Sequence, residues 1–138
     1  YLGLVRAYDN VMPIVNKTDD TPAELPEMAT LHQLRIEFKR LRYAMHFFRD
    51  VLGTSGKAFI DEIKTMQDLL GRLNDTYVAE DHLSDFVAEG LEESLVEAYL
   101  DELFAERLAL EAALPAAWKR FNTRTVMAKF SDALLMLR

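Results

Sequence analysis

The residues best suited to chemistry lie between positions 31 and 49, in the sequence LHQLRIEFKRLRYAMHFFR. This segment carries five lysines and arginines against one acid, Glu37, so its net charge is +4, whereas that of the whole chain is −7. Such a density of cations is typical of an anion site, because arginine offers a planar fork to pairs of oxygens and lysine a mobile point charge. The segment also holds His32 and His46, and a neighbouring phosphate favours the protonated, donating form of an imidazole.

The spacing of these residues places them on one face of a helix. Apolar residues form a stripe along the same helix, and each basic residue or histidine comes directly after one of them in the sequence. Because successive residues are rotated by about 100° around a helix, the polar row lies beside the apolar stripe. Like charges three or four residues apart repel by a few tenths of a kcal/mol per pair. Carboxylates elsewhere in the chain or a bound linear polyanion would each neutralise such a row, and both explanations stay open here. The six residues follow a 3-4-3-4-3 spacing: His32, Arg35, Lys39, Arg42, His46 and Arg49.

The elements that position this row are predicted to be helices. Glycine and proline are scarce, with five and four residues, and apolar residues recur with helical rather than alternating periodicity. We expect an all-α fold, an antiparallel helical bundle of about four to five helices, because two of the helices have heptad-like apolar stripes. The expected helices cover residues 2–15, 30–52 (with a start at residue 26 as an alternative), 55–88, 92–121 and 127–137, with a loop over 16–27.

Three residues punctuate these helices. Gly53 is expected to end the helix that carries the basic row, and Gly90 to separate the next two helices. Pro115 lies inside an expected helix, where it removes one backbone hydrogen bond, so we expect a kink there.

Composition excludes several classes of function. A chain of 138 residues, 50% hydrophobic and 28% charged, is expected to form one globular domain. The absence of cysteine excludes disulfides and thiolate metal sites and suits a reducing compartment, so a cytoplasmic location is expected. No apolar run is long enough to cross a membrane. The charge of −7 argues against specific nucleic-acid binding, and no nucleophile–base pair or phosphate loop indicates an enzyme or a cofactor.

Two blocks of the sequence resemble the CHAD family, the conserved histidine α-helical domain. Residues 31–43, LHQLRIEFKRLRY, are similar to the family's basic motif, and residues 66–78, MQDLLGRLNDTYV, to its second block. The resemblance implies an all-helical domain of two pseudo-symmetric halves that line a shared basic surface and bind inorganic polyphosphate. Residues 1–138 would then be a single, partial domain, the C-terminal half, completed by the missing N-terminal half-module or by a homodimer.

The resemblance also assigns roles to individual positions. In the first block it implies polyphosphate binding by His32, Arg35, Lys39, Arg40 and Arg42, with Tyr43 closing the motif. His46 stands where the family usually has an acid, so that here the basic row is lengthened.

The second block implies a supporting set of residues. We expect Asn74 and Asp75 to orient the basic side chains or to tie helices together, and Gly71 to allow a close approach of two helices. The supporting residues implied are Gln67, Asp68, Asn74 and Asp75. Placement alone adds Lys57, Lys64 and Lys119, with Arg120, as cations that could extend the positive surface.

Two other functions are weighed against polyphosphate binding. A metal site is one, but His32 and His46 are about 21 Å apart along a helix and cannot share an ion. The acidic run with Glu80, Asp81, His82 and Asp85 offers oxygen and imidazole ligand atoms. Solvent-exposed acidic helix faces that bind no metal often carry the same residue types, so no metal ligands are assigned. The other alternative is a structural or protein-interaction bundle.

Overall fold

The computed structural model describes residues 28–88 and 93–137, and the regular structure in this part of the chain is entirely helical. Four helices are present there: α2 (Met28–Phe47), α3 (Gly53–Ala88), α4 (Glu93–Phe121) and α5 (Arg124–Leu135). The predicted all-α bundle is therefore confirmed. The helix expected over residues 2–15 and the loop over 16–27 lie outside the described residues.

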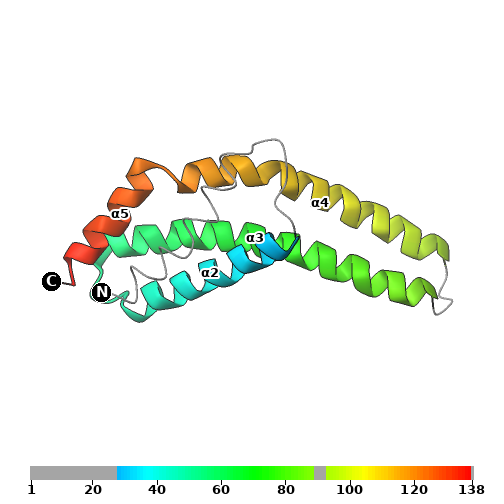
Figure 1. Cartoon of the computed structure of the whole chain (residues 1–138), viewed down its shortest axis with the longest axis horizontal. Coiled ribbons are helices and arrows are strands. Elements are labelled where there is room, and N and C mark those ends of the chain that lie inside the picture. Colours follow the sequence, from blue (N-terminus) through cyan, green and yellow to red (C-terminus); the bar gives the residue numbers. More distant parts are fainter. Residues whose placement is uncertain (1–27, 89–92, 138) are drawn as a thin grey trace.

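The first helix boundary differs from the prediction. α2 ends at Phe47 rather than at residue 52, because residues 48–52 form a turn in which the backbone N–H groups of Val51 and Leu52 both donate to the carbonyl of Phe48, at 3.0 and 3.1 Å. Gly53 follows with φ of 63°, a left-handed conformation that costs glycine little. The chain reverses at this point, so α2 and α3 are antiparallel (Figure 1).

The last two helices are close to their expected ranges. α4 remains one helix across Pro115, so the proline does not interrupt it. α5 begins at Arg124, three residues before the expected Met127, because the Thr123 hydroxyl accepts the backbone N–H of Val126 at 3.3 Å and caps the helix.

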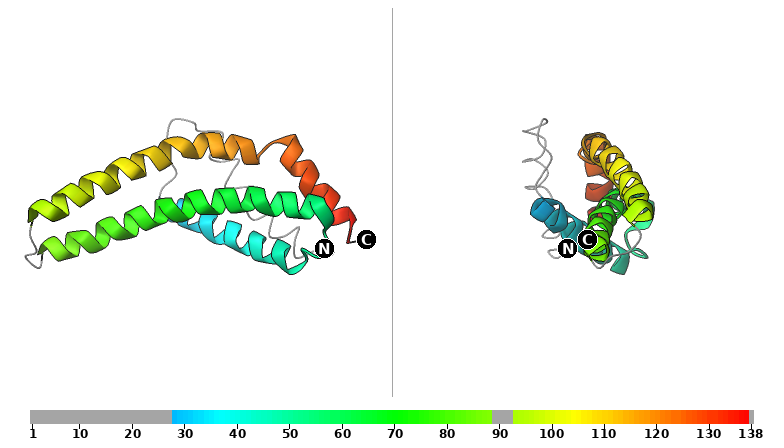
Figure 2. Two further views of the ribbon diagram at one scale, coloured as in Figure 1. Left: turned by 180° about the vertical axis from the view of Figure 1, so that it is seen from behind. Right: turned by 90° about the vertical axis from the view of Figure 1, so that its right-hand side faces the viewer.

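α3 is the central element, and it packs against α2, α4 and α5. α2 lies along the first part of α3, whereas the α3–α4 pair continues beyond α2 (Figures 1 and 2). α5 returns from the end of α4 towards the start of α3 (Figure 1). Among the described residues, no helix combines the length and apolar character that crossing a bilayer requires.

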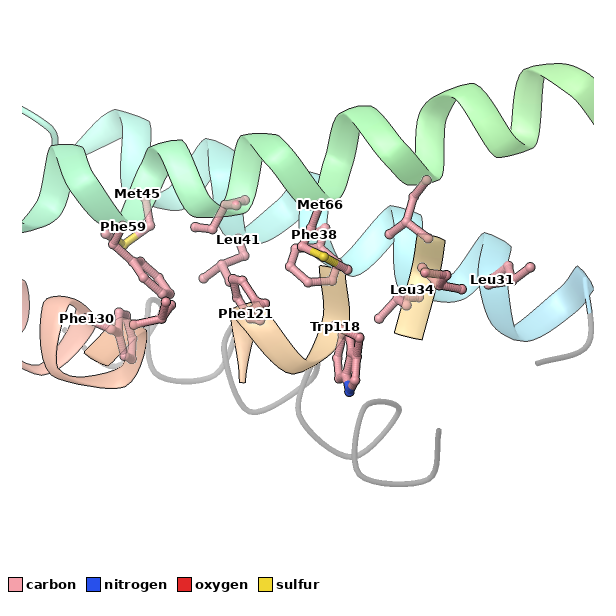
Figure 3. Close-up of a cluster of buried hydrophobic side chains, with 14 of the residues drawn as sticks. Leu31, Leu34, Phe38, Leu41, Met45, Phe59, Met66, Trp118, Phe121 and Phe130 are labelled. Atoms are coloured by element: carbon pink, nitrogen blue, oxygen red, sulfur yellow. The ribbon is translucent and has the colours of Figure 1, made fainter. Parts of the chain in front are cut away.

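The core forms where α2 meets the other three helices (Figure 3). The Phe38 ring makes edge contacts with Trp118 and Phe121, at centroid distances of 6.4 and 5.0 Å. The ring centroids of Phe59 and Phe130 are 4.9 Å apart. Each large apolar side chain buried in this way contributes roughly 1.5–3 kcal/mol. The predicted stripes are both buried, with Leu31, Leu34, Phe38, Leu41 and Met45 on α2 and Phe59, Ile63, Met66, Leu70 and Leu73 on α3.

Candidate functional site

The buried stripe of α2 fixes the direction in which the basic row faces. Because Leu34, Phe38 and Leu41 are held in the core, the neighbouring row must lie on the adjacent flank of α2, about 100° around the helix. We call this row the basic stripe: His32, Arg35, Lys39, Arg42, His46 and Arg49. The first five lie on α2, whereas Arg49 lies in the turn after the end of α2 at Phe47, so the predicted helical row is wrong at Arg49. Arg35 and Arg42 are half-buried, and the other four residues are exposed.

The basic stripe is almost free of carboxylates within the described part of the chain. Arg49 is its one member with an ion pair there, to its sequence neighbour Asp50, with Nε and Oδ1 3.5 Å apart. The Asp50 side chain is 89% exposed, and a pair of this kind contributes little. Of the two explanations left open by the sequence, neutralisation by carboxylates is therefore absent from five of the six positions among residues 28–88 and 93–137.

The acid that could have neutralised the stripe faces the opposite flank of α2. Glu37 is buried, 3% exposed, and its Oε1 accepts from Arg40 Nη1 at 2.7 Å and from Gln33 Nε2 at 2.9 Å. Arg40 lies one residue, about 100°, beyond Lys39, on the side away from Arg42. The structure thus separates Arg40 from the basic stripe and pairs it, although the family motif placed it in the binding set.

The contact that joins the stripe to α3 is made by an amide. Arg42 Nη1 donates to Gln67 Oε1 at 2.9 Å, and both side chains are half-buried. Because the acceptor is neutral, the hydrogen bond orients the guanidinium without cancelling its charge.

Two further contacts join residues that are close in sequence. Arg49 Nη1, in the turn after α2, lies 2.9 Å from His46 Nε2. A guanidinium can only donate, so His46 Nε2 is the acceptor in this contact. Lys39 Nζ lies 5.8 Å from the centroid of the exposed Tyr43 ring, within range of a cation–π contact.

The other supporting residues on α3 are placed differently from the prediction. Among the described residues neither Asn74 nor Asp75 donates to or accepts from a basic side chain, and Asp68 and Asp75 are exposed. None of the other described helices makes the close approach expected at Gly71, because none of their atoms lies within 4 Å of the position that a Cβ would occupy there. Gln67 is therefore the residue of the second block that orients a basic side chain.

The three lysines added by placement divide into two groups. Lys57 and Lys64 are exposed on α3 without ion pairs in the described chain, and Lys64 is three residues before Gln67, on the same flank. Lys119 is exposed on α4, whose opposite side carries the buried Leu114 and Phe121. The structure thus places Lys57 and Lys64 near the α2–α3 flank and Lys119 away from it.

The flank of α3 towards α4 and α5 carries paired charges. Glu62 accepts from Lys129 Nζ at 2.9 Å and lies 3.5 Å from Arg120. The hydrogen bond from Lys129 lowers the pKa of Glu62. Further along, Glu80 lies 3.4 Å from Arg107.

The same flank holds a half-buried phenol. The Tyr77 hydroxyl donates to Glu111 at 2.6 Å, and burial, followed by this hydrogen bond, raises the pKa of Tyr77. The guanidinium of Arg107 lies over the Tyr77 ring, 5.1 Å from its centroid. These groups tie α3 to α4, a structural rather than a ligand-binding use of polar side chains.

The metal alternative finds no ligand cluster in the described residues, since no group of three or more histidine, aspartate or glutamate side chains is arranged to hold an ion there. In the acidic run, Glu80 is engaged by Arg107.

Comparison with known proteins identifies the family. No curated protein and no solved structure matches this chain. A family model, that of the CHAD domain, matches residues 4–84, which is more than half of the chain and includes both sequence blocks, the basic stripe and Gln67. This protein therefore belongs to the CHAD domain family.

Proposed function

We propose that this protein binds inorganic polyphosphate through the basic stripe of α2, as a binding module and not as an enzyme. The observation that carries the proposal is the absence of carboxylate partners from five of the six stripe positions within the described residues. A row of like charges on one helix flank is unfavourable unless an anion neutralises it. A linear polyanion suits a linear row of donors better than a single small anion does.

The chemistry of the side chains supports an oxyanion ligand. Arg35 and Arg42 offer planar pairs of N–H donors, and Lys39 between them adds a compact charge. His32 extends the row with an imidazole, which can donate from either nitrogen when protonated. The association of the CHAD family with polyphosphate agrees with this reading.

The binding is expected to be electrostatic and steeply dependent on salt, because the polyanion releases counterions when cations neutralise its phosphates. The test is a calorimetric titration with polyphosphate of defined lengths at two salt concentrations, with heparin or DNA as the competing polyanion. Oligomeric state is measured in the same samples by sedimentation, since a second copy of the chain could complete the basic surface.

The deciding variant is the charge reversal R35E/K39E/R42E. We expect it to abolish binding while the helical content and thermal unfolding stay close to those of the parent protein. Retention of full affinity by this variant would remove the assignment.

A matched pair of variants separates local from global charge. R35E/R42E and R72E/R124E change the net charge equally, but Arg72 and Arg124 lie outside the stripe, and Arg72 pairs with Glu106 on α4 at 2.6 Å. We expect the first pair to lose most of the affinity and the second to retain most of it. Equal losses would show that net charge, and not the stripe, governs binding.

A further inference from the structure

One hydrogen bond joins the basic stripe to the helix beside it. Arg42 and Gln67 are 25 residues apart in the sequence, and Arg42 Nη1 donates to Gln67 Oε1 at 2.9 Å across the α2–α3 interface. Within the described chain, no other stripe residue makes a side-chain hydrogen bond or ion pair with α3.

The chemical type of the acceptor is the informative feature. On the opposite flank of α3, cations from α4 and α5 meet carboxylates, namely Glu62 for Lys129 and Glu80 for Arg107. Towards α2 the corresponding partner is an amide. Glutamine and glutamate have nearly the same shape, so a carboxylate would fit here and would bind the guanidinium more strongly. The amide holds the group while leaving its positive charge uncompensated.

The surroundings of this contact keep the guanidinium accessible. One N–H of Arg42 is used by Gln67, and an arginine has five. Gly71 lies one turn further along α3, and the space where its side chain would stand is free of described atoms within 4 Å. Arg42 is half-buried, so part of its side chain remains exposed to solvent, from which an anion would approach.

We infer that Gln67 is a positioning residue for anion binding: it holds the Arg42 guanidinium in place across the helix interface with its charge free for the ligand. The inference rests on the proposed function and adds to it a residue that itself need not touch the anion. The effect is pre-organisation, because an arginine already held by its neighbour loses less rotational freedom when the anion arrives.

The test compares two substitutions of one residue. Q67E places a carboxylate against Arg42, and we expect about a fivefold loss of affinity for inorganic polyphosphate. The slope of log affinity against log salt should also fall by about one, because one cation is no longer available. Q67L removes the acceptor but leaves the charge, so we expect about a twofold loss with an unchanged slope.

Two controls isolate the role of the contact. T65E adds the same charge on the exposed side of α3 next to Asp61, whose backbone carbonyl Thr65 contacts at 3.0 Å, and should change the slope little. In an R42Q background, Q67E should cost no further affinity, since the guanidinium that it would neutralise is gone. A purely structural role for Gln67 would change thermal stability but not the salt slope.

The outcomes for this inference and for the proposed function are distinct. If the parent protein fails to bind polyphosphate even at low salt, the proposed function is overturned and the positioning role falls with it. If the parent binds but Q67E keeps its affinity and slope, or T65E has the same effect as Q67E, only the role of Gln67 is overturned.

Discussion

The two flanks of α3 use charge in opposite ways. Towards α4 and α5, Glu62 and Glu80 each accept a cation from a neighbouring helix. Towards α2, the cations of the basic stripe have no carboxylate partner within the described residues except at Arg49, and Arg42 is held by the amide of Gln67.

This difference distinguishes charged residues that join two helices through an ion pair from cations that have no carboxylate partner in the described residues. A cation that only ties two helices together is best neutralised, because an uncompensated charge repels its neighbours and stabilises nothing. The cations left uncompensated towards α2, beside a flank of α3 whose carboxylates Glu62 and Glu80 are paired, are the charges that the proposed polyanion ligand would neutralise. The predictions below test this contrast, beginning with the largest effect.

The largest expected effect is the stabilisation of the folded protein by bound polyphosphate. Polyphosphate at about 100 times its Kd should raise the free energy of unfolding of the parent protein by about 2.7 kcal/mol. The same rise is expected for K129M, which disrupts the paired flank, but not for R35E/K39E/R42E. Chemical denaturation with and without polyphosphate measures the difference. Equal protection of the triple variant would contradict the contrast between the flanks.

The second-largest effect is expected from removing the Glu62 carboxylate, which two cations share on the flank of α3 that faces α4 and α5. Glu62 receives both Lys129 and Arg120, and its side chain is 14% exposed. We expect E62Q to lower the free energy of unfolding by about 2 kcal/mol, because two cations lose a charged acceptor. R35Q on the other flank should change it by less than about 0.5 kcal/mol. Similar losses for the two variants in urea denaturation would show that the flanks do not differ.

The pairing of Glu62 should also appear as a pH dependence. Its pKa is lowered, first by the hydrogen bond from Lys129, so the stabilisation is present above the ordinary carboxyl pKa and is lost as the pH falls through the lowered value. K129M should therefore cost about 1 kcal/mol at neutral pH and progressively less as the pH falls below the ordinary carboxyl range and through the lowered pKa of Glu62. The control is K119M, which removes an exposed lysine without an ion pair in the described chain. If K129M remains equally destabilising in acid, the Lys129–Glu62 pair is not the source of the lost stability.

A glycine pair tests the open space on the α2-facing flank. Gly71→Ala should raise the free energy of unfolding by about 0.5–1 kcal/mol, because alanine favours the helix and its Cβ meets no described atom within 4 Å. At Gly56 a Cβ would lie 2.3 Å from Leu52 Cβ, so Gly56→Ala should lower stability instead. Thermal denaturation compares them, and destabilisation by Gly71→Ala would mean that the flank is closed there.

The smallest effect is the repulsion within the stripe itself. K39Q should raise the free energy of unfolding by a few tenths of a kcal/mol at low salt, and the gain should vanish at high salt. R72Q, which removes an exposed pair with Glu106, should have the opposite sign. A destabilising K39Q at low salt would indicate that Lys39 is neutralised in the free protein.

Much of this architecture was predictable because it depends on periodicity. Most positions of the two predicted apolar stripes are buried in the core, since an apolar stripe at helical spacing has to be buried whatever its partners are. The exceptions are Phe48 and Tyr77, which are half-buried and pack against the core. Helix ends were less predictable. α2 stops at Phe47 because a turn of local hydrogen bonds precedes Gly53, and no periodic signal marks such a turn.

The site was predictable only in part. Spacing correctly placed five residues of the basic stripe on one flank of α2, but Arg49 lies beyond the end of that helix. Spacing also could not separate Arg40, whose partner Glu37 is buried on the other side. Sequence reasoning assigned the orienting role to Asn74 and Asp75, whereas Gln67 makes the contact. Gln67 was predicted as a supporting residue, but the 4-3 spacing that puts Gln67, Gly71 and Asn74 on one face of α3 cannot tell which of them lies opposite Arg42.

The sequence by itself determined that the chain is helical, which residues of α2 face the core, and that its cations form a row, because each follows from the geometry of a single helix. Only the tertiary structure decided which of these cations meet a carboxylate and which do not. Arg40 and Arg49 find carboxylates close by in the sequence, Glu37 and Asp50, whereas the contacts of Arg42 with Gln67 and of Lys129 with Glu62 join residues that are distant in sequence. Their meeting depends on how the helices pack, and no local pattern encodes that.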